Sequence, residues 1–206
     1  MNRRNVLKTL PIVLGGAIAA PTLAHLLVSC NDKEQKEISL VFLDKTDFFI
    51  VEQLADIILP ASSTIGALDV NVPLFIDKVL KNILNRKEQD MFVKGQVYFK
   101  TKFEEIYKKD SFEGNKDEFL ELLSTYFNVD GTQQKKIMKI LEETADKALD
   151  KPLYYIYKYL TFIRYYTLYG YYTSKQVGTE ILNYDPVPGI YQSCIPVEAV
   201  GNISSI

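Results

Sequence analysis

One segment, residues 152–172, constrains the fold more than any other part of the sequence. It begins with Pro152, which suits the first turn of a helix, and it holds nine of the chain's 14 tyrosines. Leucine and isoleucine fill much of the rest, so Lys158 and Arg164 are its only charged residues. A helix that is apolar on nearly every face is stable when other helices surround it. The segment therefore predicts the central helix of a bundle.

The chain before this segment also carries apolar residues at helical spacing. We expect helices over about 47–58 with Asp47 as cap, from Asn71-Val72-Pro73 onward, over 86–108, over 116–127 with Asn115 as cap, and over 133–149 with Thr132 as cap. No stretch alternates convincingly with period two, so no β-sheet is expected. After Tyr172 the prolines and glycines forbid a regular helix. The expected fold is all-α: a single helical-bundle domain of five or six helices with an irregular Pro/Gly-rich C-terminal segment.

The N-terminus has the pattern of an export leader and is set apart from the fold. Residues 9–29 contain no formal charge, and this stretch is long enough to cross a bilayer. A retained membrane anchor is therefore an alternative to a cleaved signal peptide. Pro11, Pro21 and the Gly15-Gly16 pair weaken such a helix, and the run ends in LVSC, which resembles the bacterial lipobox. The sequence therefore predicts a signal peptide at 1–29, lipidation at Cys30, a charged tether at 30–44 and the helical domain at 45–206.

The leader also contains an arginine pair, Arg3 and Arg4, within the stretch RRNVLK. This stretch resembles the twin-arginine signal, which directs export of proteins that are already folded. A basic pair is also ordinary in any signal peptide, so both interpretations stay open.

Composition excludes several classes of function. The whole chain has 24 Lys and Arg against 26 Asp and Glu, and loss of residues 1–29 would leave it more acidic, so no nucleic acid is expected as partner. The single histidine, His25, lies in the leader, and Cys194 is the one thiol after Cys30. Histidine-dependent catalysis, zinc ligation and haem attachment therefore lack their residues, and no nucleotide-binding glycine loop is present. No catalytic, cofactor-binding or metal residue is predicted.

The tyrosines predict a surface for another protein. A tyrosine hydroxyl needs a partner, and a chain of this size cannot cover every ring. Tyr165, Tyr169 and Tyr172 share one helix face by their spacing, and a break at Gly170 would let the C-terminal segment fold back beside them. The predicted partner interface comprises Tyr165, Tyr169, Tyr172, Tyr184, Pro188 and Tyr191. Two alternatives remain. The rings could belong to the core of this chain, and the C-terminal segment could pack against the helices of this chain.

Four stretches together resemble a known family. They are RRNVLK in the leader, LADIILPASSTIGALDVNVPLFID at 54–77, FIRYYTLYGYYTSKQVG at 162–178 and YDPVPGIYQSC at 184–194. Their order is similar to that in the small subunit, called subunit 3 or gamma, of gluconate 2-dehydrogenase and related membrane-bound flavin-dependent sugar dehydrogenases. The resemblance implies a helical, non-catalytic subunit that binds no cofactor and is bound to a large GMC-type flavoprotein carrying FAD. It also implies electron transfer to a cytochrome c subunit, although the lipobox suggests that this chain is itself an anchor.

The expected function is therefore that of an accessory subunit, needed for folded export, stability and anchoring of a flavin-dependent sugar or sugar-acid dehydrogenase. The expected location is the bacterial cell envelope, on the periplasmic side, with attachment to the membrane through the lipid. The alternative is a stand-alone envelope lipoprotein that binds a small ligand, such as a sugar, in a tyrosine-rich groove.

Overall fold

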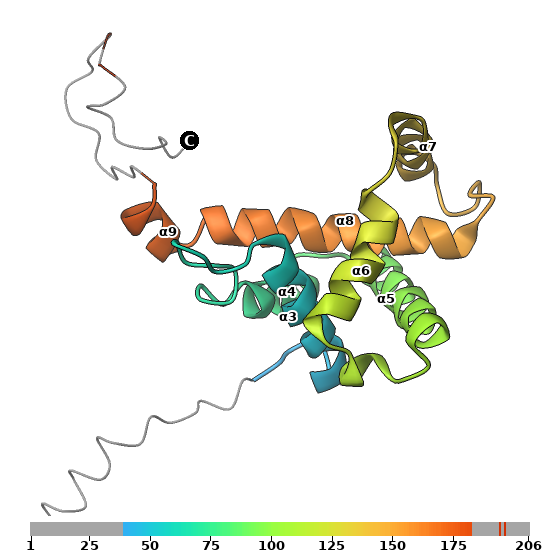
Figure 1. The fold of residues 1–206 in the computed structure, drawn as a ribbon, viewed down its shortest axis with the longest axis horizontal. Coiled ribbons are helices and arrows are strands. Elements are labelled where there is room, and N and C mark those ends of the chain that lie inside the picture. The colour runs from blue at the N-terminus through green and yellow to red at the C-terminus, as the bar shows by residue number, and fades with distance from the viewer. Residues whose placement is uncertain (1–38, 183–193, 195, 197–206) are drawn as a thin grey trace, which may run out of the picture. The chain divides into compact units, whose positions relative to one another are not determined.

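The computed structural model describes residues 39–182, together with Cys194 and Pro196. Within this part of the chain there are seven α-helices, one short 3-10 helix and no strand (Figure 1). The helices are α3 (Lys45–Ile58), α4 (Val72–Asn82), α5 (Arg86–Tyr107), η1 (Ser111–Glu113), α6 (Lys116–Phe127), α7 (Gly131–Glu142), α8 (Lys151–Tyr172) and α9 (Lys175–Glu180). The all-α prediction is confirmed. None of the described helices combines the length and the apolar character needed to cross a bilayer.

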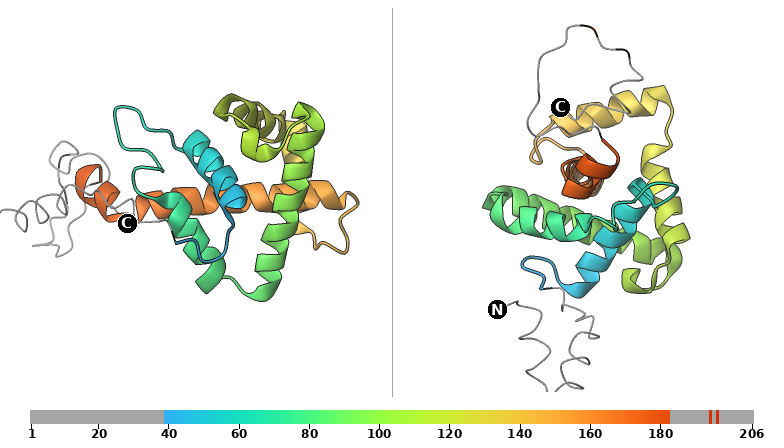
Figure 2. Two further views of the ribbon diagram at one scale, coloured as in Figure 1. Left: turned by 90° about the horizontal axis from the view of Figure 1, so that it is seen from below. Right: turned by 90° about the vertical axis from the view of Figure 1, so that its left-hand side faces the viewer.

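Helix α8 occupies the centre of the bundle, as its composition predicts. It contacts α3, α4, α5, α7 and α9, and Tyr159, Leu160 and Ile163 on its inner face are almost fully buried. In the nearly end-on view of Figure 2, α7 lies on one side of α8 while α3 and α4 lie on the other. The phenylalanines of α5 and α6, such as Phe99 and Phe119, complete the core.

Two glycines let neighbouring helices approach α8 closely. A Cβ on Gly95 of α5 would collide with the backbone carbonyl of Tyr155, and a Cβ on Gly170 would lie 2.6 Å from the ring of Phe75 in α4. Gly170 is buried inside α8, which continues to Tyr172. The expected break at Gly170 is therefore wrong, because the residue serves close packing and does not end the helix.

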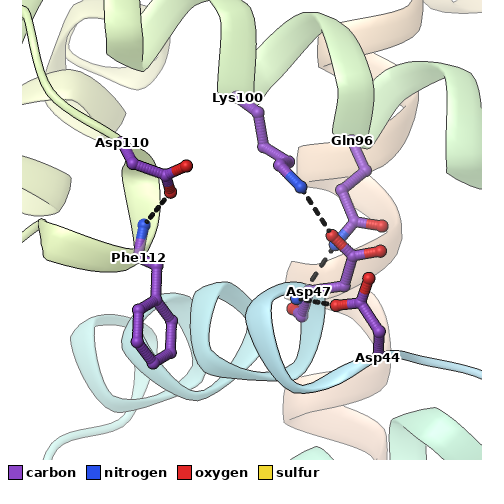
Figure 3. Close-up of polar contacts among 6 residues, drawn as sticks. All are labelled: Asp44, Asp47, Gln96, Lys100, Asp110 and Phe112. Atoms are coloured by element: carbon purple, nitrogen blue, oxygen red, sulfur yellow. Dashed lines mark hydrogen bonds and ion pairs between the residues drawn. The ribbon is translucent and has the colours of Figure 1, made fainter.

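The N-cap of helix α3 lies three residues before the expected cap, Asp47. Asp44 is the actual N-cap, because its side chain accepts a hydrogen bond from the Asp47 backbone N–H at 2.7 Å. Asp47 instead links α3 to α5: its carboxylate accepts from Lys100 Nζ at 3.0 Å, and its carbonyl accepts from the Gln96 side chain at 3.4 Å (Figure 3). Asp47 thus makes tertiary contacts, which the spacing of residues along one helix does not reveal.

The other expected boundaries are mixed in outcome. Asn115 caps α6 in a reciprocal capping box with Glu118, as predicted. Asp130, not Thr132, caps α7, and α7 ends at Glu142 and does not continue to 149. Residues after Tyr172 were expected to be irregular, yet Ser174 caps the short helix α9, which buries Val177. With α9, the described part of the chain has seven α-helices, where five or six were expected.

A buried carboxylate fastens the start of the domain. Asp77 of α4 is 1% exposed, and it accepts hydrogen bonds from the backbone N–H groups of Val41, Phe42 and Leu43 at 2.8, 3.0 and 2.8 Å. Leu43 itself is buried in the core. The last residues of the expected tether therefore belong to the folded domain.

A candidate partner interface on helix α8

Seven of the nine tyrosines of α8 are either buried or exposed, and the other two, Tyr155 and Tyr166, are half-buried. Tyr154, Tyr157, Tyr159 and Tyr171 are at most 7% exposed, whereas Tyr165, Tyr169 and Tyr172 are 60%, 50% and 52% exposed. The core interpretation is thus confirmed for the buried rings, whereas the partner interpretation stays a prediction for the exposed ones. The inner rings form the core and the outer three remain available to another molecule.

The buried rings are held by hydrogen bonds to backbone carbonyls where these are within reach. The Tyr157 hydroxyl donates to the carbonyl of Tyr126 at 3.1 Å, and the Tyr171 hydroxyl donates to that of Ile65 at 2.8 Å. Burial raises the pKa of Tyr159, and burial together with the nearby Tyr157 and Asp150 raises the pKa of Tyr126 to about 12. These phenols are thus kept neutral and structural.

The exposed rings share one face of α8, as their spacing predicts. Tyr165 and Tyr169 stack with 6.1 Å between ring centroids and 10° between ring planes, and Tyr169 also contacts Phe75 of α4 at 6.1 Å. These contacts hold the rings of Tyr165 and Tyr169 in place on the surface. Rigid surface aromatics lose little entropy on binding, which makes them effective anchors for another protein.

The same three tyrosines line a groove of about 1130 Å³. Its other walls come from the C-terminal end of α3, from α6 and from α7, and include Phe127 and Met138, which are 42% and 57% exposed. Arg164 is the one charged residue among the described residues that line it. The arrangement is an apolar, aromatic surface with a single cation.

Helix α7 explains why this surface is left open. The helix carries its apolar residues Ile137, Met138 and Leu141 toward the groove, yet it has no buried residue. An amphipathic helix gains most of its stability by burying its apolar face. The apolar face of α7 is therefore incompletely covered by the described part of the chain.

The structure describes three of the six residues predicted for the interface, and their role in binding stays a prediction. Tyr165, Tyr169 and Tyr172 come together on one exposed face, whereas Tyr184, Pro188 and Tyr191 lie outside the described residues, as do Arg3, Arg4 and Cys30. No local pattern selects Phe127, Met138 or Arg164, because their place in the groove depends on how α6, α7 and α8 pack. Within the described residues, no three His, Cys, Asp or Glu side chains gather as metal ligands would.

Comparison with known proteins identifies the family to which this bundle belongs. No curated protein and no solved structure matches the chain. The sequence model of one family, gluconate 2-dehydrogenase subunit 3, matches residues 45–189, which include the whole described bundle and most of the chain. The chain therefore belongs to the gluconate 2-dehydrogenase subunit 3 family.

Proposed function

We propose that this chain is the non-catalytic small subunit of a flavin-dependent sugar or sugar-acid dehydrogenase, and that it binds the large flavoprotein through the tyrosine face of α8. Membership of a dehydrogenase subunit family supports an accessory role in such a complex. The observation that carries the proposal is the exposure of Tyr165, Tyr169 and Tyr172 along an apolar groove. A partner would bury these rings, and FAD would be bound by that partner.

The groove suits a protein segment better than a sugar. Two of its hydroxyl groups are already used within α8, because Thr161 donates to the carbonyl of Tyr157 and Thr173 donates to that of Tyr169, each at 2.6 Å. Sugar sites need several convergent polar groups, whereas this lining is mostly Leu, Ile, Phe, Met and Tyr. Stand-alone sugar binding thus has less support, and a titration with gluconate tests it directly.

The leader completes the proposal. Arg3 and Arg4 would direct export of the folded subunit with its bound partner, and Cys30 would carry a lipid that holds the complex at the periplasmic side of the bacterial envelope. A diacylated cysteine provides two acyl chains, which is enough for stable anchoring, whereas one chain gives marginal binding. A cytochrome c subunit would then accept the electrons.

The decisive experiment separates affinity from stability. We would tag the chain, isolate the dehydrogenase that co-purifies with it, and compare Tyr169→Ala with Tyr159→Ala and with Val97→Ala. Val97 is 55% exposed on α5 outside the groove and serves as the surface control. Tyr169→Ala should weaken binding by roughly 2 kcal/mol with little change in melting temperature. Tyr159→Ala, at a fully buried ring, should cost roughly 3–5 kcal/mol of folding stability.

A second variant examines the C-terminal part of the predicted interface. Deletion of residues 185–206, which include Pro188 and Tyr191, should reduce capture of the dehydrogenase while the bundle melts almost as before. Equal capture by the wild type, Tyr169→Ala and the deletion variant would show that the flavoprotein binds elsewhere. A yellow preparation of the chain alone, with flavin absorption that survives dialysis, would contradict its non-catalytic role.

A further inference from the structure

The two cations within residues 152–172 have different surroundings. Lys158 Nζ donates to the carbonyl of Leu141 in α7 at 2.6 Å and lies 5.5 Å from the ring centroid of Tyr154. Arg164 is exposed, and it forms no ion pair with any residue in the described part of the chain. Lys158 therefore binds within the fold, whereas the charge of Arg164 is not paired with any described residue.

Arg164 lies in apolar surroundings that a bound segment would cover. It lines the groove together with Leu160, Leu168 and Tyr165, and no carboxylate from the described residues lines the groove with it. Burial of a cation without a partner is strongly unfavourable, whereas a hydrogen-bonded carboxylate offsets the lost hydration. The planar guanidinium matches a carboxylate with two parallel hydrogen bonds. Whatever fills the groove must therefore bring a negative charge to this position.

We propose that the groove between α6, α7 and α8 takes an apolar segment of the partner subunit that carries an aspartate or glutamate, and that this carboxylate pairs with Arg164. The identity of the partner rests on the proposed function. A groove-to-groove dimer of this chain does not meet the same requirement, because the described lining of a second groove contains no carboxylate to pair with Arg164. The aromatic rings provide the apolar contact, and Arg164 sets the register of the bound segment.

The test compares variants of the full chain in their affinity for the dehydrogenase that co-purifies with the wild type. Arg164→Leu removes the charge and keeps an apolar side chain, and Arg164→Lys keeps the charge but not the planar fork. Lys78→Leu is the matched control, because Lys78 is an exposed cation on α4 that does not line the groove. Each affinity is measured at low and high ionic strength.

We expect Arg164→Leu to weaken binding at least about tenfold and to lose most of the salt dependence of the wild type. Arg164→Lys should be intermediate, and Lys78→Leu should match the wild type. If Arg164→Leu binds within about twofold of the Lys78→Leu control, the pairing with a carboxylate is refuted.

Other outcomes separate this inference from the proposed function. A dehydrogenase that depends on Tyr169 but not on Arg164 overturns the pairing and leaves the proposed function intact. Failure of any dehydrogenase to bind the wild type overturns both. If Arg164→Leu lowers the melting temperature of the full chain but not that of a variant without residues 183–206, the chain's own C-terminal residues fill the groove and the proposal falls. Self-association of the wild type that Arg164→Leu abolishes would assign the groove to a second copy, which overturns it as well.

Discussion

Replacement of Asp77 should destabilise the domain more than the loss of any single surface interaction. Its carboxylate accepts three backbone N–H groups at 2.8 to 3.0 Å from residues 34 to 36 positions earlier in the chain. In Asp77→Ala the N–H of Leu43 loses its partner in a buried place, and that of Phe42 loses its partner in a half-buried one. Each unpaired N–H group costs about 1–3 kcal/mol, whereas the N–H of the exposed Val41 can donate to water. We therefore expect the free energy of unfolding to fall by roughly 3–5 kcal/mol.

Asp77→Asn should fall between the wild type and Asp77→Ala. One oxygen remains to accept from Phe42 and Leu43, but the amide nitrogen replaces the oxygen that faces the Val41 N–H. We expect a loss of about 2 kcal/mol, from one hydrogen bond and the charge that strengthens the others. Asp69→Ala is the control, because the exposed Asp69 makes one local bond, to the Gly66 N–H at 2.7 Å.

Two measurements check this reasoning. Urea unfolding followed by circular dichroism gives the free energies of unfolding, and amide hydrogen exchange reports residues 41–43 directly. In Asp77→Ala these amides should exchange much faster than in the wild type. If Asp77→Ala unfolds with the same free energy as Asp69→Ala, or if the exchange of these amides is unchanged, the carboxylate does not hold this segment.

Four further predictions follow from the close packing, the buried phenols and the leader. Gly95→Ala should lose roughly 1–3 kcal/mol in urea unfolding despite better helix propensity, because the new Cβ meets rigid backbone of α8; a more stable variant would contradict this. Folding stability should fall as pH rises from 10 toward 12, because burial raises the pKa of Tyr126 from its ordinary value of 10.0 to about 12 in the folded chain; alkaline unfolding of Tyr126→Phe should be less steep, and an identical profile would refute the assignment. Cys30→Ala should leave a larger precursor that incorporates no labelled fatty acid, and unchanged mass and labelling would rule out lipidation. The Arg3→Lys, Arg4→Lys pair keeps the charge but should block export, whereas normal export of this variant would exclude the twin-arginine route.

The sequence was sufficient for those parts of the fold that local pattern determines. A run of tyrosine, leucine and isoleucine with two charges leaves a helix no stable place except the centre, so α8 could be placed from composition alone. Asn115 followed by Glu118 three residues later is a local signal, and it caps α6 as predicted. The shared face of Tyr165, Tyr169 and Tyr172 follows from helix geometry in the same way.

The predictions that were wrong concern features that depend on contacts between distant segments. Asp47 has the residue type of a cap, but a tertiary bond to Lys100 uses its side chain and Asp44 does the capping. Gly170 has the appearance of a helix breaker, yet the approach of Phe75 requires a glycine within the helix. Similarly, the groove depends on how α3, α6, α7 and α8 pack against one another, and α7 ends at Glu142 with no buried residue. No spacing within one segment contains that information.

The hydrogen bonds from residues 41–43 to Asp77 would also limit the distance between the domain and a membrane, if the proposed lipid anchor is present. If Cys30 carries the lipid, the stretch between the lipid and the residues that Asp77 holds ends near Leu40, about four residues before the predicted end of the tether. About ten residues span at most roughly 35 Å when fully extended, comparable to the thickness of one bilayer. With lipidation at Cys30, Leu40 would therefore lie within about 35 Å of the lipid surface, and the domain would begin close to the membrane.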